Sequence, residues 1–128
     1  MNQIQILNKF SNISADEITK VALSALKKLG IEDKIVEVES LDKEGILKLN
    51  FEYRGKKEPT DVLSFPLVQF PGENNLLGNI FICEKIARDR KEDLQELVKH
   101  GILHLLNYDH ETDWNEWEQK AQIINHKM

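Results

Sequence analysis

HGILHLLNYDH, the sequence of residues 100–110, contains three of the four histidines of this 128-residue chain. His100 and His104 are four residues apart, so on a helix their imidazoles share one face and lie one turn from each other. If that helix ends near Asn107 and the chain folds back, His110 supplies a third nitrogen ligand and leaves a fourth tetrahedral position for water. The stretch therefore predicts a catalytic site with one zinc ion held by His100, His104 and His110.

The alternative interpretation of these histidines is structural, since a single histidine on an apolar helix is usually a core residue bonded to the backbone. The third histidine and Asn107 favour the metal, because asparagine accepts the left-handed conformation with which a helix can end. Apolar residues line one face of the same segment: Leu94, Leu97, Val98, Ile102 and Leu105. We therefore expect a buried helix and buried histidines.

The histidine spacing also matches the extended zincin pattern H-E-x-x-H-x-x-G-x-x-H, in which the glutamate is the general base of a peptidase. Gly101 occupies the position of that glutamate. A peptidase would thus lack its base, although zinc would still lower the pKa of a bound water to about 7. The substrate has to be inferred from other residues.

The composition is that of an ordinary globular protein, with 41% hydrophobic and 30% charged residues, and we expect one domain over residues 1–128. The net charge of −5 argues against tight, indiscriminate phosphate binding but allows a local basic patch. With one cysteine, Cys83, no intramolecular disulfide forms, which fits a reducing cytoplasm. Neither a secretory leader nor a membrane-spanning segment is expected.

The first half of the chain shows a helix between predicted strands. Residues 4–7 read as a short strand, and Ser14 with Glu17 forms a capping box for a helix that stops at Gly30. Alternating residues predict two half-buried strands, at 36–38 and 47–53. The turn between them has hairpin length and contains glycine, so we expect the two strands to pair antiparallel.

The second half supplies further strands and the last helix. Residues 62–70 favour an edge strand because prolines interrupt them, whereas the apolar run 80–83 predicts a buried strand. A final helix begins near residue 112 or 113, with its core stripe formed by Trp114, Trp117, Ala121 and Ile124. The predicted fold class is α+β: a single domain in which a small mixed β-sheet packs against helices, one of them zincin-like and carrying the metal ligands.

Phosphate chemistry is indicated by the polar loop 54–61. Arg54 begins it with a planar, permanently charged group suited to bidentate phosphate contact, so it is the candidate catalytic residue. Asp61 could orient a ligand histidine through its second nitrogen, as could Asp109, or both could cap turns. Ser64 has no identifiable base and is interpreted as structural. The remaining basic groups are interpreted as solvated loop or helix surface: Lys56, Lys57, Lys85, Arg88, Arg90 and Lys91.

Three motifs together resemble a known family. HGILHLLNYDH at 100–110, YRGKKEPTDVLSFP at 53–66 and LLGNIFIC at 76–83 are similar to the motifs of the YbeY family of bacterial metal-dependent endoribonucleases. The motifs occur in the family's order, and the resemblance covers most of the chain. The resemblance implies a single-strand endoribonuclease acting in ribosomal RNA processing and ribosome quality control, with one zinc ion on His100, His104 and His110. It also places the family's functionally important arginine at Arg54.

The resemblance implies partners as well: single-stranded RNA, and ribosomal RNA or a ribosomal subunit, with no membrane. Two positions depart from the family pattern, Asn107 in place of the usual glycine and Asn79 in place of aspartate. The second change removes a charge. Two alternatives remain open at this point: an RNA-associated assembly factor with a structural zinc, and a metal-dependent hydrolase of another substrate.

Overall fold

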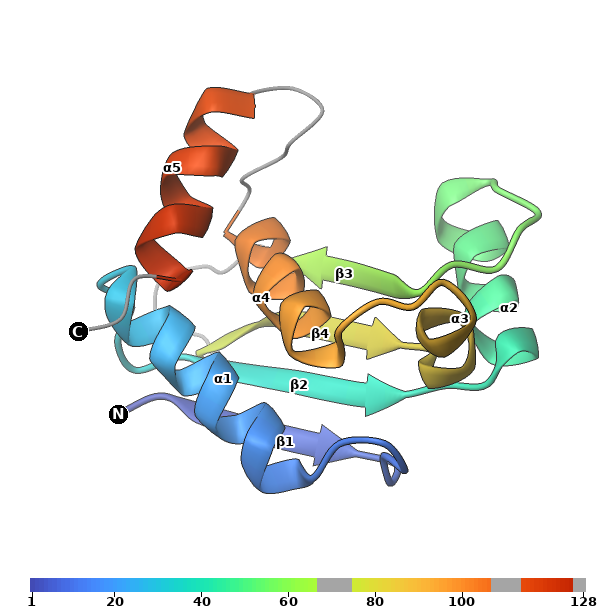
Figure 1. Ribbon diagram of the computed structural model, residues 1–128, viewed down its shortest axis with the longest axis horizontal. Helices are drawn as coiled ribbons and strands as arrows, with labels where there is room; N and C mark the ends of the chain where they lie inside the picture. The colour runs from blue at the N-terminus through green and yellow to red at the C-terminus, as the bar shows by residue number, and fades with distance from the viewer. Residues whose placement is uncertain (67–74, 107–113, 126–128) are drawn as a thin grey trace.

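The computed structural model describes residues 1–66, 75–106 and 114–125, which form a four-stranded sheet and the helices packed on it (Figure 1). In chain order the elements are β1 (Gln3–Leu7), α1 (Ala15–Lys28), β2 (Ile35–Ser40), α2 (Lys43–Arg54), β3 (Val62–Pro66), β4 (Leu76–Ile82), α3 (Glu84–Asp89), α4 (Leu94–Leu105) and α5 (Trp114–Asn125).

The sheet is mixed, with strand order β1-β2-β4-β3. β1, β2 and β4 run parallel, and β3 pairs antiparallel with β4 at the edge. The predicted strands at 4–7 and 80–83 and the predicted edge strand from 62 are confirmed, although residues 67–70 of the last lie outside the described residues. Val38 of β2 stands beside Ile80 of β4, and both are fully buried. This central pair faces the main core.

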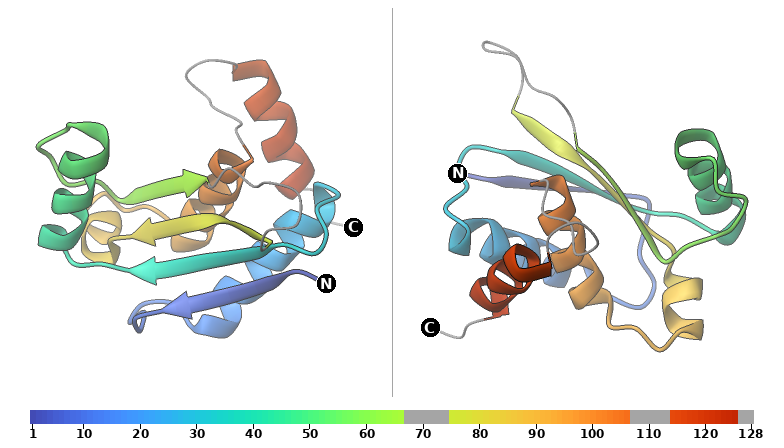
Figure 2. Two further views of the ribbon diagram at one scale, coloured as in Figure 1. Left: turned by 180° about the vertical axis from the view of Figure 1, so that it is seen from behind. Right: turned by 90° about the horizontal axis from the view of Figure 1, so that it is seen from above.

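Helices cover both faces of the sheet. α1, α4 and α5 lie on one side, and α2 lies on the other side near one end of β3 and β4 (Figure 2). α1 begins at the predicted cap, where the Ser14 Oγ accepts a hydrogen bond from the Glu17 backbone N–H at 3.0 Å. It is followed by Gly30, which has a φ of 74°, the left-handed conformation expected of a helix stop.

The predicted strand at 47–53 is wrong, because these residues belong to α2. The Asp42 side chain caps the helix by accepting a hydrogen bond from the Gly45 N–H at 2.7 Å, and Gly55 ends it with a φ of 69°. Two of the alternating apolar residues have exposed side chains, Phe51 at 49% and Tyr53 at 67%. A helix that buries a different face exposes them in this way. The positions of the apolar residues fit both the strand period and the helix period. The helix forms because its cap and its tertiary contacts stabilise it.

The predicted antiparallel hairpin between residues 36–38 and 47–53 is therefore also wrong. β2 has parallel neighbours on both sides, β1 and β4. In the chain, α1 separates it from β1, and α2 and β3 separate it from β4. α2 instead packs its Ile46 into a second, smaller apolar cluster against Leu63 of β3. The chain therefore leaves the sheet after β2 and crosses to the other face.

α4 lies against β4 because it carries a glycine at the contact. A Cβ at Gly101 would come within 2.8 Å of the Ile80 side chain. Gly78 of β4 serves the same contact from the sheet, since a Cβ there would lie 2.6 Å from Leu105. Helix and sheet thus approach more closely than ordinary side chains would permit.

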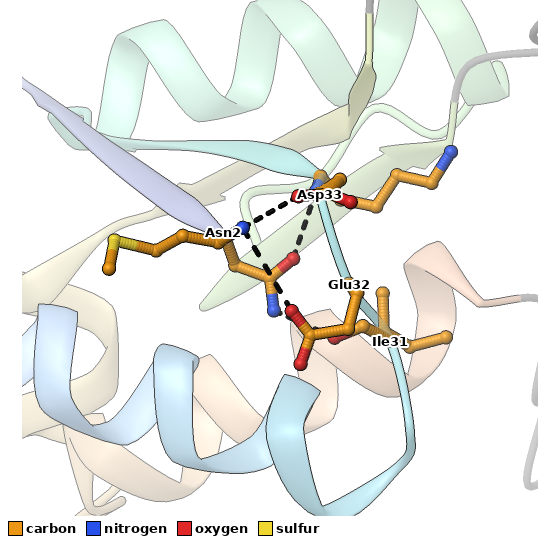
Figure 3. A network of polar contacts seen from close by, with 6 residues as sticks. Asn2, Ile31, Glu32 and Asp33 are labelled. Carbon is orange, nitrogen blue, oxygen red and sulfur yellow. Dashed lines mark hydrogen bonds and ion pairs between the residues drawn. The ribbon is translucent and has the colours of Figure 1, made fainter.

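The start of β1 is secured by a buried polar side chain. The Asn2 amide donates a hydrogen bond to the Ile31 carbonyl at 2.8 Å and its oxygen accepts one from the Lys34 N–H at 2.9 Å (Figure 3). The Met1 ammonium lies 2.6 Å from an Asp33 carboxylate oxygen. These contacts join the first strand to the turn that precedes β2.

The core stripe of the last helix is shorter than predicted. Trp117 and Ile124 of α5 are buried, but Trp114 is 59% exposed. α5 begins at Trp114, and this first residue lies outside the core that Trp117 joins. Among the described residues, no helix is both long and apolar enough to cross a membrane.

Candidate metal centre

His100 and His104 of α4 line the same hollow, which has a volume of about 350 Å³ and which we call the histidine hollow. The i, i+4 spacing on the helix places both imidazoles on one face, as predicted. The complete lining is Asp61, Val62, Glu92, Asp93, Glu96, Leu97, His100 and His104. Both histidines are half-buried, so the prediction of fully buried histidines is wrong: α4 turns its leucines to the core and its histidines to the hollow.

A tryptophan from α5 lies beside both imidazoles. The Trp117 ring centroid is 5.6 Å from that of His100 and 5.0 Å from that of His104. The indole is buried, with 6% of its surface exposed. The two histidines therefore contact a neighbouring helix as well as facing the hollow.

Acidic groups dominate the polar wall of the histidine hollow, and two of them share a proton. Hydrogen bonding to Asp61, reinforced by burial and by the Asp61 charge, raises the pKa of Glu92 to about 7. Burial alone would raise the pKa of Asp61, but hydrogen bonds from Glu92 and Thr60 and the Arg90 charge hold it below its ordinary value. At neutral pH the proton of the pair belongs mainly to Glu92.

The two arginines of interest occupy different places. Arg54 is exposed at the last position of α2, outside the lining of the histidine hollow. Arg90, assigned from the sequence to a solvated helix surface, has its guanidinium Nη1 3.7 Å from an Asp61 carboxylate oxygen. Arg90 thus touches the wall of the histidine hollow, whereas Arg54 does not line it.

The structure also shows the surroundings of three other residues that were singled out from the sequence. Gly101 faces Ile80 in the core, so any side chain at that position, a peptidase base included, would require Ile80 to move. Ser64 has a buried hydroxyl without a hydrogen-bond partner among the described residues, which fits its structural interpretation. Asn79 of β4 donates a hydrogen bond to the Glu37 carboxylate at 2.6 Å, which an ionised aspartate could not do.

Three residues of the sequence prediction lie outside the described residues: Asn107, Asp109 and His110. Within the described ranges, no three metal-ligating side chains come together. The donors that are present nevertheless fit a transition metal such as zinc, because two imidazoles on one helix face share a hollow with several carboxylates. An acidic hollow also attracts a cation.

Sequence reasoning missed several residues of the site. Glu96 precedes His100 by four residues, as His100 precedes His104, so a search for repeated i, i+4 polar groups would have found it. Glu92 and Arg90 gave no such signal, because their contact with Asp61 joins distant segments. Trp117 was assigned to the core, and only the docking of α5 places it against the histidines.

Comparison with known proteins identifies the family that this chain matches. Residues 3–127 match the sequence model of the family described as Endoribonuclease YbeY. The chain is 37% identical over 135 residues to a protein of that name from Aquifex aeolicus (strain VF5), covering 99% of this chain and 90% of the relative. It is 38% identical to a protein of the same name from Sulfurovum sp. (strain NBC37-1), covering 88% of this chain and 81% of the relative.

A solved structure is also similar. The solution structure of a Thermotoga maritima protein superposes with a TM-score of 0.58 and 26% sequence identity. The match covers 94% of this chain and 86% of that one, so the two share their overall fold.

Proposed function

We propose, because this chain belongs to the endoribonuclease YbeY family, that it is an endoribonuclease acting in ribosomal RNA processing. In finer detail, we propose a zinc-dependent enzyme that cleaves single-stranded RNA in the cytoplasm, on ribosomal RNA or a ribosomal subunit, with residues 1–128 as one domain. The buried, free Cys83 is compatible with a reducing compartment.

The observation that carries the proposal is the pair of half-buried histidines in an acidic hollow. We assign the metal to His100, His104 and His110. The first two lie on α4, which we regard as a zincin-like helix. When bound, zinc would lower the pKa of a water molecule or polarise a phosphate oxygen. The protein's part is to hold the two described imidazoles on one rigid helix and to surround them with carboxylates that favour a cation.

The neighbouring groups have separate roles in this proposal. Arg54 is the catalytic residue that contacts an RNA phosphate and stabilises the charge of its oxygens. Its exposure at the end of α2 leaves the guanidinium accessible to a large substrate. Glu92 carries a proton shared with Asp61 at neutral pH, inside the same hollow as the histidines. A group with a pKa of about 7 is suited to holding or releasing a proton near neutral pH.

The experiment combines metal analysis with cleavage of single-stranded RNA. We expect the wild-type protein to contain about one zinc ion per chain and to cleave the RNA internally. His104→Ala should lose both properties. Arg54→Ala should keep the metal and lose cleavage by at least about 100-fold, the effect typical of removing a charge-stabilising donor. End-group analysis would identify the attacking oxygen.

Control variants separate the proposal from its rivals. Lys56→Ala removes an exposed charge next to Arg54 in sequence and should cleave RNA at a rate near that of the wild type. Cleavage that persists unchanged in His104→Ala would show that the metal assignment is wrong. RNA that is bound but never cleaved by any preparation would indicate an assembly factor with a structural zinc.

A further inference from the structure

Trp117 is the side chain from outside α4 that the structure places against both candidate ligands at once. Its ring centroid lies 5.0 Å from His104 and 5.6 Å from His100, with interplanar angles of 46° and 57°. Such tilted pairs at this separation are favourable aromatic contacts. A single buried indole thus touches two imidazoles that are one helical turn apart.

This arrangement restricts how either imidazole can turn. Both histidines are only half-buried, so burial alone does not fix the orientation of their rings. The indole lies beside both rings and is itself held, because it is buried in the main core. Rings that are already ordered lose less conformational freedom when they bind a ligand, which strengthens binding.

We propose that Trp117 is a positioning residue for His100 and His104, holding both imidazoles in the orientation from which they bind the metal ion. The inference rests on the proposed function insofar as the ligand is a metal. Trp117 touches the ligand residues, and no contact with the metal or with RNA is assigned to it. The contact between Trp117 and the two histidines of α4 therefore becomes part of the metal site.

The first test measures the affinity for zinc alone, by competition with a chromophoric chelator, in three variants. Trp117→Leu should weaken zinc binding about tenfold, the lower end of what loss of a group supporting metal ligands usually causes. Trp117→Phe keeps an aromatic ring beside the histidines and should restore the dissociation constant to within about threefold of the wild-type value.

Ile124→Ala is the matched control for folding. Ile124 is buried on the same helix, about two helical turns after Trp117. This variant should lower the melting temperature while leaving the zinc affinity within about twofold, the scatter expected for a site that is not touched. The proposal fails if Trp117→Leu binds zinc as tightly as the wild type, or if Ile124→Ala weakens zinc binding equally.

The second test uses tryptophan fluorescence, because the chain has two tryptophans. In Trp114→Phe the remaining indole is Trp117, and its emission should change when zinc is added. In Trp117→Phe the remaining indole is Trp114, which is largely exposed and should report little change. A silent Trp117, or an equal response from Trp114, would contradict the proposed contact.

The third test needs no metal and so distinguishes failure of this inference from failure of the proposed function. Three-bond NMR couplings report the side-chain rotamers of His100 and His104 in metal-free protein. We expect one rotamer for each ring in the wild type and in Ile124→Ala, and averaged couplings in Trp117→Leu. A wild type that binds no zinc but shows this difference would refute the metal site and keep the positioning role. Unchanged couplings in Trp117→Leu would refute the positioning role.

Discussion

α4 and α2 are helices of 12 residues, both capped by an aspartate, yet they relate to the sheet in opposite ways. α4 buries six residues against the sheet and α1, and its remaining face lines the histidine hollow. α2 buries only Ile46 and Asn50 on the other side of the sheet, and its last turn is exposed. This difference indicates that a helix holds metal-binding side chains in fixed positions only where its other faces are packed.

This contrast fits the division of roles in the proposed site. A metal ion requires ligands within a few tenths of an ångström of fixed positions, which suits α4. A phosphate on a long, flexible RNA strand can be met by an exposed arginine, which suits the end of α2. Four experiments test this contrast between α4 and α2.

The largest expected effect is the removal of a buried isoleucine from each helix. Ile102→Ala in α4 should lower the free energy of unfolding by about 4 kcal/mol, near the upper end for such truncations. Ile46→Ala in α2 should lower it by about 2 kcal/mol, because the smaller cluster around it can collapse more easily. Urea unfolding measures both. Equal losses would mean that the two clusters hold their helices equally firmly.

The next effect concerns glycine. Gly101→Ala should destabilise the fold by about 1–3 kcal/mol, because the new methyl group would press on Ile80. Gly55→Ala, at the end of α2, meets no neighbouring atom within 4 Å and should lose only about 1 kcal/mol through its left-handed conformation. Thermal unfolding of both variants checks this order, and a harmless Gly101→Ala would show that α4 can move away from the sheet.

Removing the aspartate caps should produce similar, smaller effects in the two helices. Asp42 accepts a hydrogen bond from the Gly45 N–H at 2.7 Å, and Asp93 accepts one from the Gln95 N–H at 2.8 Å. Asp42→Ala and Asp93→Ala should each lose about 1 kcal/mol in denaturant unfolding. A much larger loss for Asp93→Ala would assign it a role in the histidine hollow beyond capping, since Asp93 also lines that hollow.

The smallest effect is a pH dependence near α4. The folded-state pKa of Glu92 is raised to about 7, so its contribution to stability is complete below its ordinary value of 4.5 and is lost as pH rises through 7. Asp61 acts in the opposite sense, since its lowered pKa stabilises the fold above its ordinary value and that contribution is lost in acid.

Glu92→Gln isolates this contribution, because an amide donates a hydrogen bond to Asp61 at every pH. The free energy of unfolding of the variant minus that of the wild type should increase from pH 5 to pH 8. The gain should stay below about 1 kcal/mol, because Glu92 is largely exposed and solvent screens the interaction. Urea midpoints at the two pH values measure it, with Glu96→Gln as the control on the same wall. A parallel pH dependence in all three proteins would contradict the shared proton.

Much of the fold could be read from local signals. The cap at Ser14 was predicted where the structure has it. The apolar runs of β4 and α4 were assigned to the correct type of element, although the strand was predicted only at 80–83 and β4 covers Leu76–Ile82. The segment 47–53 was mispredicted because its apolar residues satisfy both the strand period and the helix period. Pairing of β2 with β1 and β4 could not be read, since it depends on which strands meet in three dimensions.

The sequence by itself determined that His100 and His104 share a helix face, because the spacing of four residues fixes that relation in any α-helix. It also showed that Gly101 stands where the zincin pattern has its glutamate, whereas the close approach of this glycine to Ile80 became known only from the structure. The tertiary structure alone decided that Asp61, Glu92 and Trp117 surround those histidines. These residues come from separate segments, and only the packing of β3, α4 and α5 brings them together, which no local periodicity encodes.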